Sequence, residues 1–482
     1  MDGLLGLLVG GVVVFLFMTR ASSAGIRHQK ESNASSTSVS TLLRSHFENI
    51  PINQLSVSER QFPYRMRADL QRTIEKLISD EFNVLQFFGV QKDFAFVGIS
   101  ISDCMIESDE NSATSVPPEY EELDIGEDQP FRVLKQGMWL MQSKELRLAV
   151  LLSSSGMPGE KSGMQVQVAT TNSVEGTQVT QLFFNNLQEA ISEAVSYRGK
   201  ILSLEQTKHS YSGQSAGISV HKLRNVERDQ VILPELALAL LERNVIQFVR
   251  QRPQLQQMGM STKKGLLFYG PPGTGKTHTI HFLAKALEGH TMLLISAEQV
   301  ALLSEYMALA RLLQPSIVVM EDVDLIARER SQMGSACEEA LLNRLLNEMD
   351  GLKEEADILF ILTTNRPQVL EAALASRPGR VDQAIEFPLP DEDGRQKLIT
   401  MYAPSVTIDD RIMVDLVKRT EGVSAAFIKE LMRRIAQFSI ERNDGEQISP
   451  QDVNGAMDEM LIRGGTLNLS ILGASERVAE ET

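Results

Sequence analysis

Residues 270–277 read GPPGTGKT and match the phosphate-binding loop pattern G-x-x-x-x-G-K-[ST] at every fixed position. The glycines allow the backbone to turn its N–H groups toward a phosphate without a side-chain clash. Lys276 supplies a positive charge for the β- and γ-phosphates, and the Thr277 hydroxyl can bind Mg²⁺. The loop therefore predicts a site for ATP with Mg²⁺. The residues expected to bind the nucleotide are Gly270, Pro271, Pro272, Gly273, Thr274, Gly275, Lys276, Thr277 and His278.

The segments on either side of the loop have the patterns of a strand and a helix. Residues 264–269 form a short apolar run, as in a buried strand. Residues 278–288 place Ile280, Leu283 and Leu287 on one helical face. A helix N-terminus directs unpaired N–H groups and the positive end of its dipole at a ligand. The strand, loop and helix together predict an anion site, which a chance glycine-rich turn would lack.

Two carboxylates follow an apolar run about 40 residues after the phosphate loop. Residues 316–320 are apolar and are followed directly by Glu321 and Asp322. In open α/β sheets ligands bind at the carboxyl ends of the strands. One carboxylate there can hold Mg²⁺ and the next can orient the attacking water. We therefore predict that Glu321 and Asp322 are catalytic and that Glu321 shares the metal with Thr277. An acidic surface turn is the alternative reading of such a pair.

Further polar residues follow a third apolar run, residues 358–362. Asn365 lies just beyond it, where an amide can position the water or contact the γ-phosphate. Arg377 and Arg380 flank a Pro-Gly turn, and arginine suits bidentate contact with phosphate oxygens. If these arginines project from the edge of the subunit, they can complete the site of a neighbour.

In this order and spacing, the segments GPPGTGKT, EDVD, TTNRP and RPGRVD resemble the AAA ATPases. The resemblance covers residues 230–465. It implies that Asn365 is the first sensor and that Arg377 and Arg380 are arginine fingers in a homo-oligomeric ring, typically a hexamer. It also implies ATP hydrolysis coupled to chaperone-like remodelling of protein substrates. The expected fold is α/β, with a parallel-sheet ATPase domain and a C-terminal helical lid.

Two features depart from the family pattern. The usual acid order is Asp then Glu, whereas this chain has Glu321 then Asp322. The shorter side chain at the second position could slow turnover, so a nucleotide-gated scaffold with little hydrolysis is the alternative function. In addition, no aromatic–glycine pore loop lies between Ser296 and Pro315, and Tyr306 fits a helical core position. This makes threading of an unfolded chain doubtful.

These departures, together with the apolar N-terminus, are similar to one AAA branch. It contains the mitochondrial chaperone that inserts the Rieske iron–sulfur protein. The likeness is confined to the ATPase module, so that substrate is not carried over. A membrane-tethered AAA protease would need an H-E-x-x-H zinc motif, which this sequence lacks.

The N-terminal segment is predicted to anchor the chain in a membrane. Residues 3–18 carry no charge, and a helix of that length spans about 24 Å against a hydrocarbon core of roughly 30 Å. Basic residues follow this segment, at Arg20, Arg27 and Lys30, rather than preceding it as in a signal peptide. Their position favours a single-pass protein with its ATPase domain in the cytoplasm or an ATP-containing matrix.

Composition sets limits on partners and chemistry. The net charge of −16 argues against nucleic acid as a partner. Cys104 and Cys337 form no metal or disulfide pattern. Residues 107–128 are acidic and predict a loop. The expected plan is an anchor (1–20), a flexible linker (21–41), an α+β N-domain serving as substrate module or spacer (42–222), an ATPase subdomain (223–390), a helical lid (391–465) and a polar tail (466–482).

Overall fold

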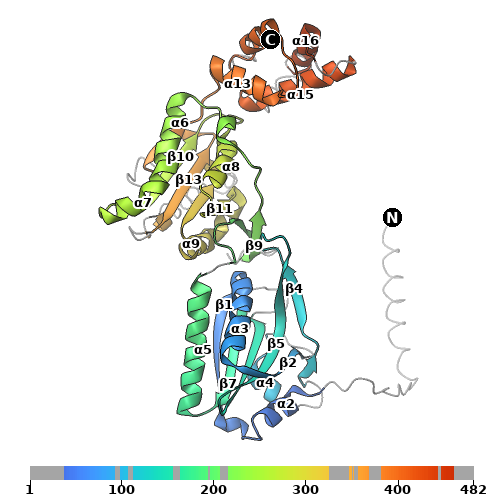
Figure 1. Ribbon diagram of the computed structural model, residues 1–482, viewed down its shortest axis with the longest axis vertical. Helices are drawn as coiled ribbons and strands as arrows, with labels where there is room; N and C mark the ends of the chain where they lie inside the picture. The colour runs from blue at the N-terminus through green and yellow to red at the C-terminus, as the bar shows by residue number, and fades with distance from the viewer. Residues whose placement is uncertain are drawn as a thin grey trace, which may run out of the picture.

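The computed structural model places three parts one after another along its longest axis (Figure 1). They are an N-terminal domain, the domain that carries the predicted phosphate loop, which we call the ATPase domain after that prediction, and a helical lid. The residues that it describes are 37–92, 98–106, 112–155, 163–193, 196–206, 215–324, 347–349, 351, 356–368, 381–442 and 447–460. The expected anchor (residues 3–18) and tail (466–482) lie outside these ranges. Among the helices within them, none combines the length and the apolar character needed to cross a bilayer.

The N-terminal domain is a seven-stranded antiparallel sheet in the order β1-β7-β6-β5-β2-β3, with β4 also paired to β5. The strands are β1 (Leu55–Pro63), β2 (Asn83–Gln91), β3 (Thr114–Val116), β4 (Glu119–Leu123), β5 (Phe131–Ser143), β6 (Leu146–Ser155) and β7 (Gly163–Thr171). The helices are α2 (Val39–His46), α3 (Arg67–Glu81), α4 (Ile101–Met105) and α5 (Val174–Glu193).

Both faces of this sheet are covered, which explains why β6 is apolar at five successive residues, Leu148–Leu152. Val150 and Leu152 of β6 belong to the core shared with α3 and α5. Ala149 and Leu151 belong to the core shared with α2 and α4. Successive side chains of a strand point to opposite faces, so one strand contributes to two cores.

The acidic segment predicted to be a loop is instead partly strand, because neighbouring basic residues pair with its acids. Within residues 107–128, β3 and β4 form ladders with β2 and β5. Glu121 pairs with Arg67 at 2.7 Å, and Glu119 pairs with Lys135 at 3.3 Å. Tyr120 packs against the main core. The end of the expected linker also differs, since α2 begins at Val39.

The ATPase domain contains a second seven-stranded sheet, in the order β14-β10-β13-β12-β11-β8-β9. All its pairings are parallel except β8 with β9, which confirms the predicted parallel sheet. Its strands are β8 (Ile201–Gln206), β9 (Ser215–His221), β10 (Lys264–Tyr269), β11 (Thr291–Ile295), β12 (Ser316–Met320), β13 (Ile358–Thr364) and β14 (Gln383–Glu386).

Helices cover both faces of this second sheet. One face packs against α6 (Glu235–Leu241), the π-helix η4 (Glu242–Gln247), α7 (Phe248–Gln257) and α8 (Lys276–Ala286). The other packs against η5 (Ala297–Leu302) and α9 (Leu303–Leu312).

The first two strands of this sheet lie within the range expected for the N-domain, 42–222. β8 pairs in parallel with β11, Ile201 opposite Met292, and β9 pairs with β8. Sheet membership therefore assigns residues 201–206 and 215–221 to the ATPase domain. Their short apolar runs hold no information on which of the two sheets they join.

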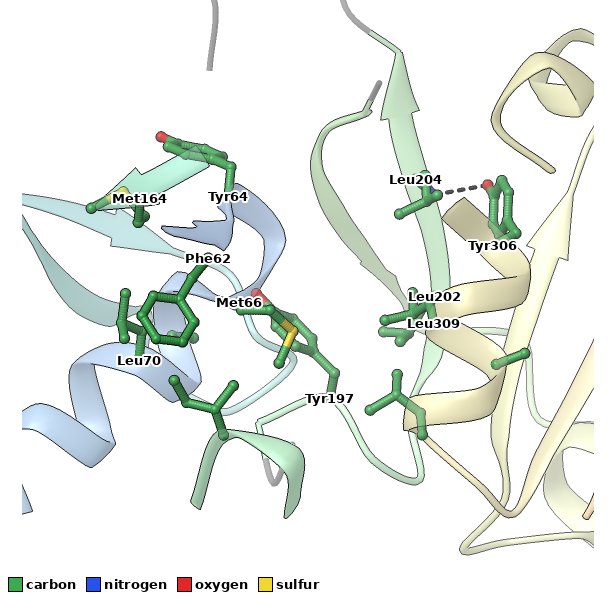
Figure 2. Packing of buried hydrophobic residues seen from close by; sticks show 14 of the residues in the cluster. Phe62, Tyr64, Met66, Leu70, Met164, Tyr197, Leu202, Leu204, Tyr306 and Leu309 are labelled. Atoms are coloured by element: carbon green, nitrogen blue, oxygen red, sulfur yellow. Dashed lines mark hydrogen bonds between the residues drawn. The ribbon is translucent and has the colours of Figure 1, made fainter. Parts of the chain in front are cut away.

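The N-terminal and ATPase domains share one continuous core. Figure 2 shows Phe62 and Met66 facing Leu202 and Leu309 across Tyr197. Tyr306 has an exposed fraction of 0%. Its hydroxyl accepts a hydrogen bond from the Leu204 N–H at 2.8 Å and donates one to Gln299 Oε1 at 3.0 Å. The prediction that Tyr306 is a core residue is confirmed.

The lid consists of α13 (Glu392–Tyr402), α14 (Asp410–Arg419), α15 (Ala425–Glu441) and α16 (Pro450–Asp458). Each helix is capped at its N-terminus by a side chain that accepts a hydrogen bond from a backbone N–H of the first turn. The capping residues are Asp391, Asp409, Ser424 and Ser449. Their apolar faces meet in a separate small core that includes Leu398, Phe427, Leu431, Ile435 and Val453.

Candidate active site

The phosphate loop joins the end of β10 to the start of α8, as the sequence predicted. Gly270 has φ +148°, and a Cβ there would lie 2.1 Å from the Phe387 carbonyl oxygen. No side chain caps the first turn of α8. Its N–H groups are therefore available to an anion at the positive end of the helix dipole.

Lys276 is buried in this loop with an exposed fraction of 7%. Its Nζ donates to the Gly270 carbonyl at 2.7 Å and to the Pro271 carbonyl at 2.9 Å. Burial lowers the pKa of Lys276 to about 8, against the opposing effect of the Asp322 and Asp324 charges.

The predicted acids and the predicted amide meet beside the loop. The Thr277 hydroxyl donates to Glu321 Oε1 at 2.8 Å. Asn365 Nδ2 donates to Asp322 Oδ1 at 3.0 Å. β13 lies between β10 and β12 in the sheet, which places Asn365 between the loop and the acids. The contacts join Glu321 to Thr277, the threonine predicted to bind the metal, and Asp322 to the expected sensor.

Asp324 is a supporting residue to which sequence reasoning gave no role. Its exposed fraction is 4%, and its Oδ1 accepts from the Thr364 hydroxyl at 2.7 Å and from the Asn365 N–H at 3.1 Å. It therefore fixes the backbone that carries the sensor amide. The only signal was its place two residues after Asp322, in the EDVD segment.

A cavity of about 420 Å³ contains the loop, Asp322 and Asn365. Its remaining walls come from residues 230–233 and from the lid, through Leu398, Met401, Tyr402, Ala426 and Lys429. His278 Nε2 lies 3.1 Å from the Gln230 carbonyl oxygen on this wall, and burial lowers the pKa of His278. No local motif marked the lid residues, since they come from segments far apart in the chain. Arg377, Arg380 and Cys337 lie outside the described residues.

The residues present fit Mg²⁺. Thr277 and Glu321 offer hard oxygen donors, and Mg²⁺ in such sites usually takes one or two protein oxygens together with water and phosphate oxygens. Within the described part of the chain, no cluster of three or more His, Cys, Asp or Glu side chains forms a complete metal site.

Comparison with known proteins identifies this region. Residues 266–389 match the family model "ATPase family associated with various cellular activities (AAA)". This segment is an ATPase domain of the AAA family, as its motifs predicted.

Similar proteins are named as proteasome-activating nucleotidases and as 26S proteasome regulatory subunits. The proteasome-activating nucleotidase of Sulfurisphaera tokodaii is 35% identical over 45% of this chain and 58% of its own length. That of Methanosphaerula palustris is 30% identical over 45% of this chain and 55% of its own length. The 26S proteasome regulatory subunit 10B of Dictyostelium discoideum is 28% identical over 61% of this chain and 70% of its own length. The chain thus spans little more than half the length of the nucleotidases that it matches.

The lid contacts the loop at Gly273, and this contact can be tested. Gly273 has φ +76°, and a Cβ there would lie 2.9 Å from both Ala426 Cβ and Ser424 Oγ. We expect Gly273→Ala to move the lid and to weaken binding of a non-hydrolysable ATP analogue by about tenfold or more, about 1.4 kcal/mol. Gly259→Ala is the matched control, because Gly259 has φ +72° and a methyl group added there would have no atom within 4 Å.

Both variants carry about 1–2 kcal/mol of left-handed backbone strain, which urea unfolding measures. Only Gly273→Ala adds the clash. Equal nucleotide affinity in the two variants would show that the lid contact is not needed for binding.

The pKa of Lys276 predicts a pH dependence of nucleotide binding. The free protein loses the ammonium charge as the pH rises through about 8, whereas bound phosphates favour the charged form. Binding therefore takes up a proton above pH 8, and the Kd for the ATP analogue should rise by up to tenfold per pH unit. Burial lowers the pKa values of His278 and His281, so both stay neutral in this range.

Calorimetry between pH 7 and 9.5 measures this slope. In Lys276→Arg the guanidinium stays charged, so binding is weaker but its pH dependence should be flat. An unmodified protein whose affinity does not change over this range would contradict the assignment.

Proposed function

We propose that this chain hydrolyses ATP in a homo-oligomeric ring, typically a hexamer, to remodel protein substrates at a membrane. The main support is that one cavity is lined by the phosphate loop, Asp322 and Asn365. Thr277 of the same lining donates a hydrogen bond to Glu321. The family match and the nucleotidase relatives both indicate ATP hydrolysis.

Each residue has a part in this proposal. Thr277 and Glu321 would hold Mg²⁺, which when bound neutralises charge on the phosphates. Lys276 would place its ammonium on the β- and γ-phosphates. Asp322, held by Asn365, would orient the attacking water as general base. Arg377 and Arg380 would act on the site of the neighbouring subunit.

We propose that movement of the ATPase domain during hydrolysis is passed to the substrate through the N-terminal domain. The η5–α9 segment takes the place where threading members carry a pore loop. It is packed against β8 through Tyr306 and joined to the N-terminal domain by the 3.0 Å Arg65–Glu305 ion pair. The relatives named above give no support to the narrower likeness to the Rieske-inserting branch, so no such substrate is proposed.

Phosphate release tests the catalytic assignments. We expect Lys276→Ala to abolish ATP binding and turnover. Asp322→Asn should retain binding but lower kcat by about 10²–10⁴-fold, the usual contribution of a positioned base. Asp393→Asn is a control for loss of one carboxylate, because Asp393 is an exposed lid acid paired with Lys397. ATP binding without phosphate release by the unmodified protein would favour the nucleotide-gated scaffold.

Subunit mixing tests the arginine fingers. Arg380→Ala alone should lose turnover while keeping ATP binding. Mixed with the Lys276→Ala variant, it should regain part of the activity, because the Lys276→Ala subunit still supplies an arginine to an intact loop. Mixing that restores nothing would count against action between subunits.

The membrane anchor rests on the uncharged residues 3–18 and the basic residues that follow them. We expect full-length protein to sediment with membranes through an alkaline wash, and a variant lacking residues 1–20 to remain in the supernatant. Full-length protein recovered in the supernatant would rule the anchor out.

A further inference from the structure

A second cavity, of about 380 Å³, lies between the N-terminal and ATPase domains. The N-terminal domain contributes the 3₁₀ turn η2 (Tyr64–Met66) and residues 121–124 at the end of β4. The ATPase domain contributes Glu205 of β8 and residues 217–220 of β9. None of these residues lines the nucleotide cavity. We name this second cavity the interdomain cleft.

The edge of the ATPase sheet forms one wall of the cleft. β9 is the last strand of that sheet among the described residues. Four consecutive β9 residues line the cleft. Side chains alternate between the two faces of a sheet, so consecutive lining residues indicate that the strand presents its backbone edge. An edge strand offers N–H and C=O groups that an extended peptide can pair with.

The charge of the cleft is predominantly negative, because its two arginines are already paired. Arg67 contacts both carboxylate oxygens of Glu121, at 2.7 and 3.4 Å, and Arg65 pairs with Glu305. The other acids that line the cleft are Glu122, Asp124 and Glu205. None of these three takes part in an ion pair within the described ranges.

The side chains at this edge suit a strand-like ligand. Ser219 Oγ donates to Glu205 Oε1 at 2.9 Å, which holds that carboxylate at the cleft. Ile218 and Val220 pack against the shared core, so the edge is anchored to the domain behind it. A ligand would therefore meet a fixed backbone edge flanked by carboxylates.

We propose that the interdomain cleft binds an extended segment of a partner protein, rich in lysine or arginine, by strand addition to β9. Main-chain hydrogen bonds to β9 would supply affinity, and the carboxylates would select positive charge. The proposal goes beyond ATP hydrolysis and does not depend on it, because peptide binding and phosphate release are separate measurements.

Fluorescence anisotropy with three labelled nine-residue peptides tests the ligand chemistry on the full-length chain. The first alternates lysine with threonine, and the second replaces each lysine by glutamate. The third keeps the lysines but carries N-methyl groups on four consecutive central amides, which removes strand pairing and retains charge. We expect the first to bind, with affinity falling as salt is raised, and the other two to bind at least tenfold more weakly.

Charge reversal locates the site. Glu205→Lys and Glu122→Lys should each weaken binding of the lysine peptide at least tenfold, with basal phosphate release unchanged. Both side chains are exposed, so folding should tolerate the changes. The matched control is Glu175→Lys in the first turn of α5, an exposed acid outside the cleft, which should bind as the unmodified protein does.

Three results would overturn the proposal. These are equal binding of the N-methylated peptide, binding unaffected by both charge reversals, and absence of binding by the lysine peptide. Concentration-dependent self-association that Glu205→Lys abolishes would assign the edge to a second copy of the chain instead.

Discussion

The parallel ladder of β10, β13 and β12 is the constraint on which the candidate active site depends. Parallel strands end at the same edge of a sheet, so three segments far apart in sequence deliver the loop, Asn365 and the acids to one place. The Thr277–Glu321 contact of 2.8 Å measures how closely these strand ends converge. Any change that shifted the register of β10 or β12 against β13 would separate Thr277 from Glu321, the two predicted metal ligands.

The reversed acid order agrees with this geometry. Glu321 reaches the Thr277 hydroxyl, and Asp322, with φ +48°, is held by the Asn365 amide. A left-handed backbone at a non-glycine residue costs about 1–2 kcal/mol. That strain is compensated locally, because the Asp322 N–H donates to the Thr363 hydroxyl at 3.0 Å. The backbone conformation of Asp322 thus sets the position of its carboxylate. The missing methylene, compared with glutamate, does not by itself decide whether Asp322 can orient the water.

The sequence predicted those parts of the molecule whose chemistry lies in contiguous segments. The loop, the strand ends and the helical lid each have a local pattern, and the structure places them as expected. Long-range features had no such pattern. β8 joins the ATPase sheet through its pairing with β11, and β4 forms a ladder with β5 in which Arg67 and Lys135 pair with its acids. The lid wall of the nucleotide cavity likewise depends on the packing of two subdomains.

The sheet of the ATPase domain connects the nucleotide cavity with the interdomain cleft. The Glu321 N–H donates to the Ile295 carbonyl at the end of β11, and β11 pairs with β8. Gln299 then donates to the Leu204 carbonyl of β8 at 2.8 Å and accepts from Tyr306. Hydrogen bonds therefore link the acids to β11 and β11 to β8, whose Glu205 lines the interdomain cleft. Both cavities thus border one sheet, the nucleotide cavity at the ends of β12 and β13 and the cleft at β8 and β9.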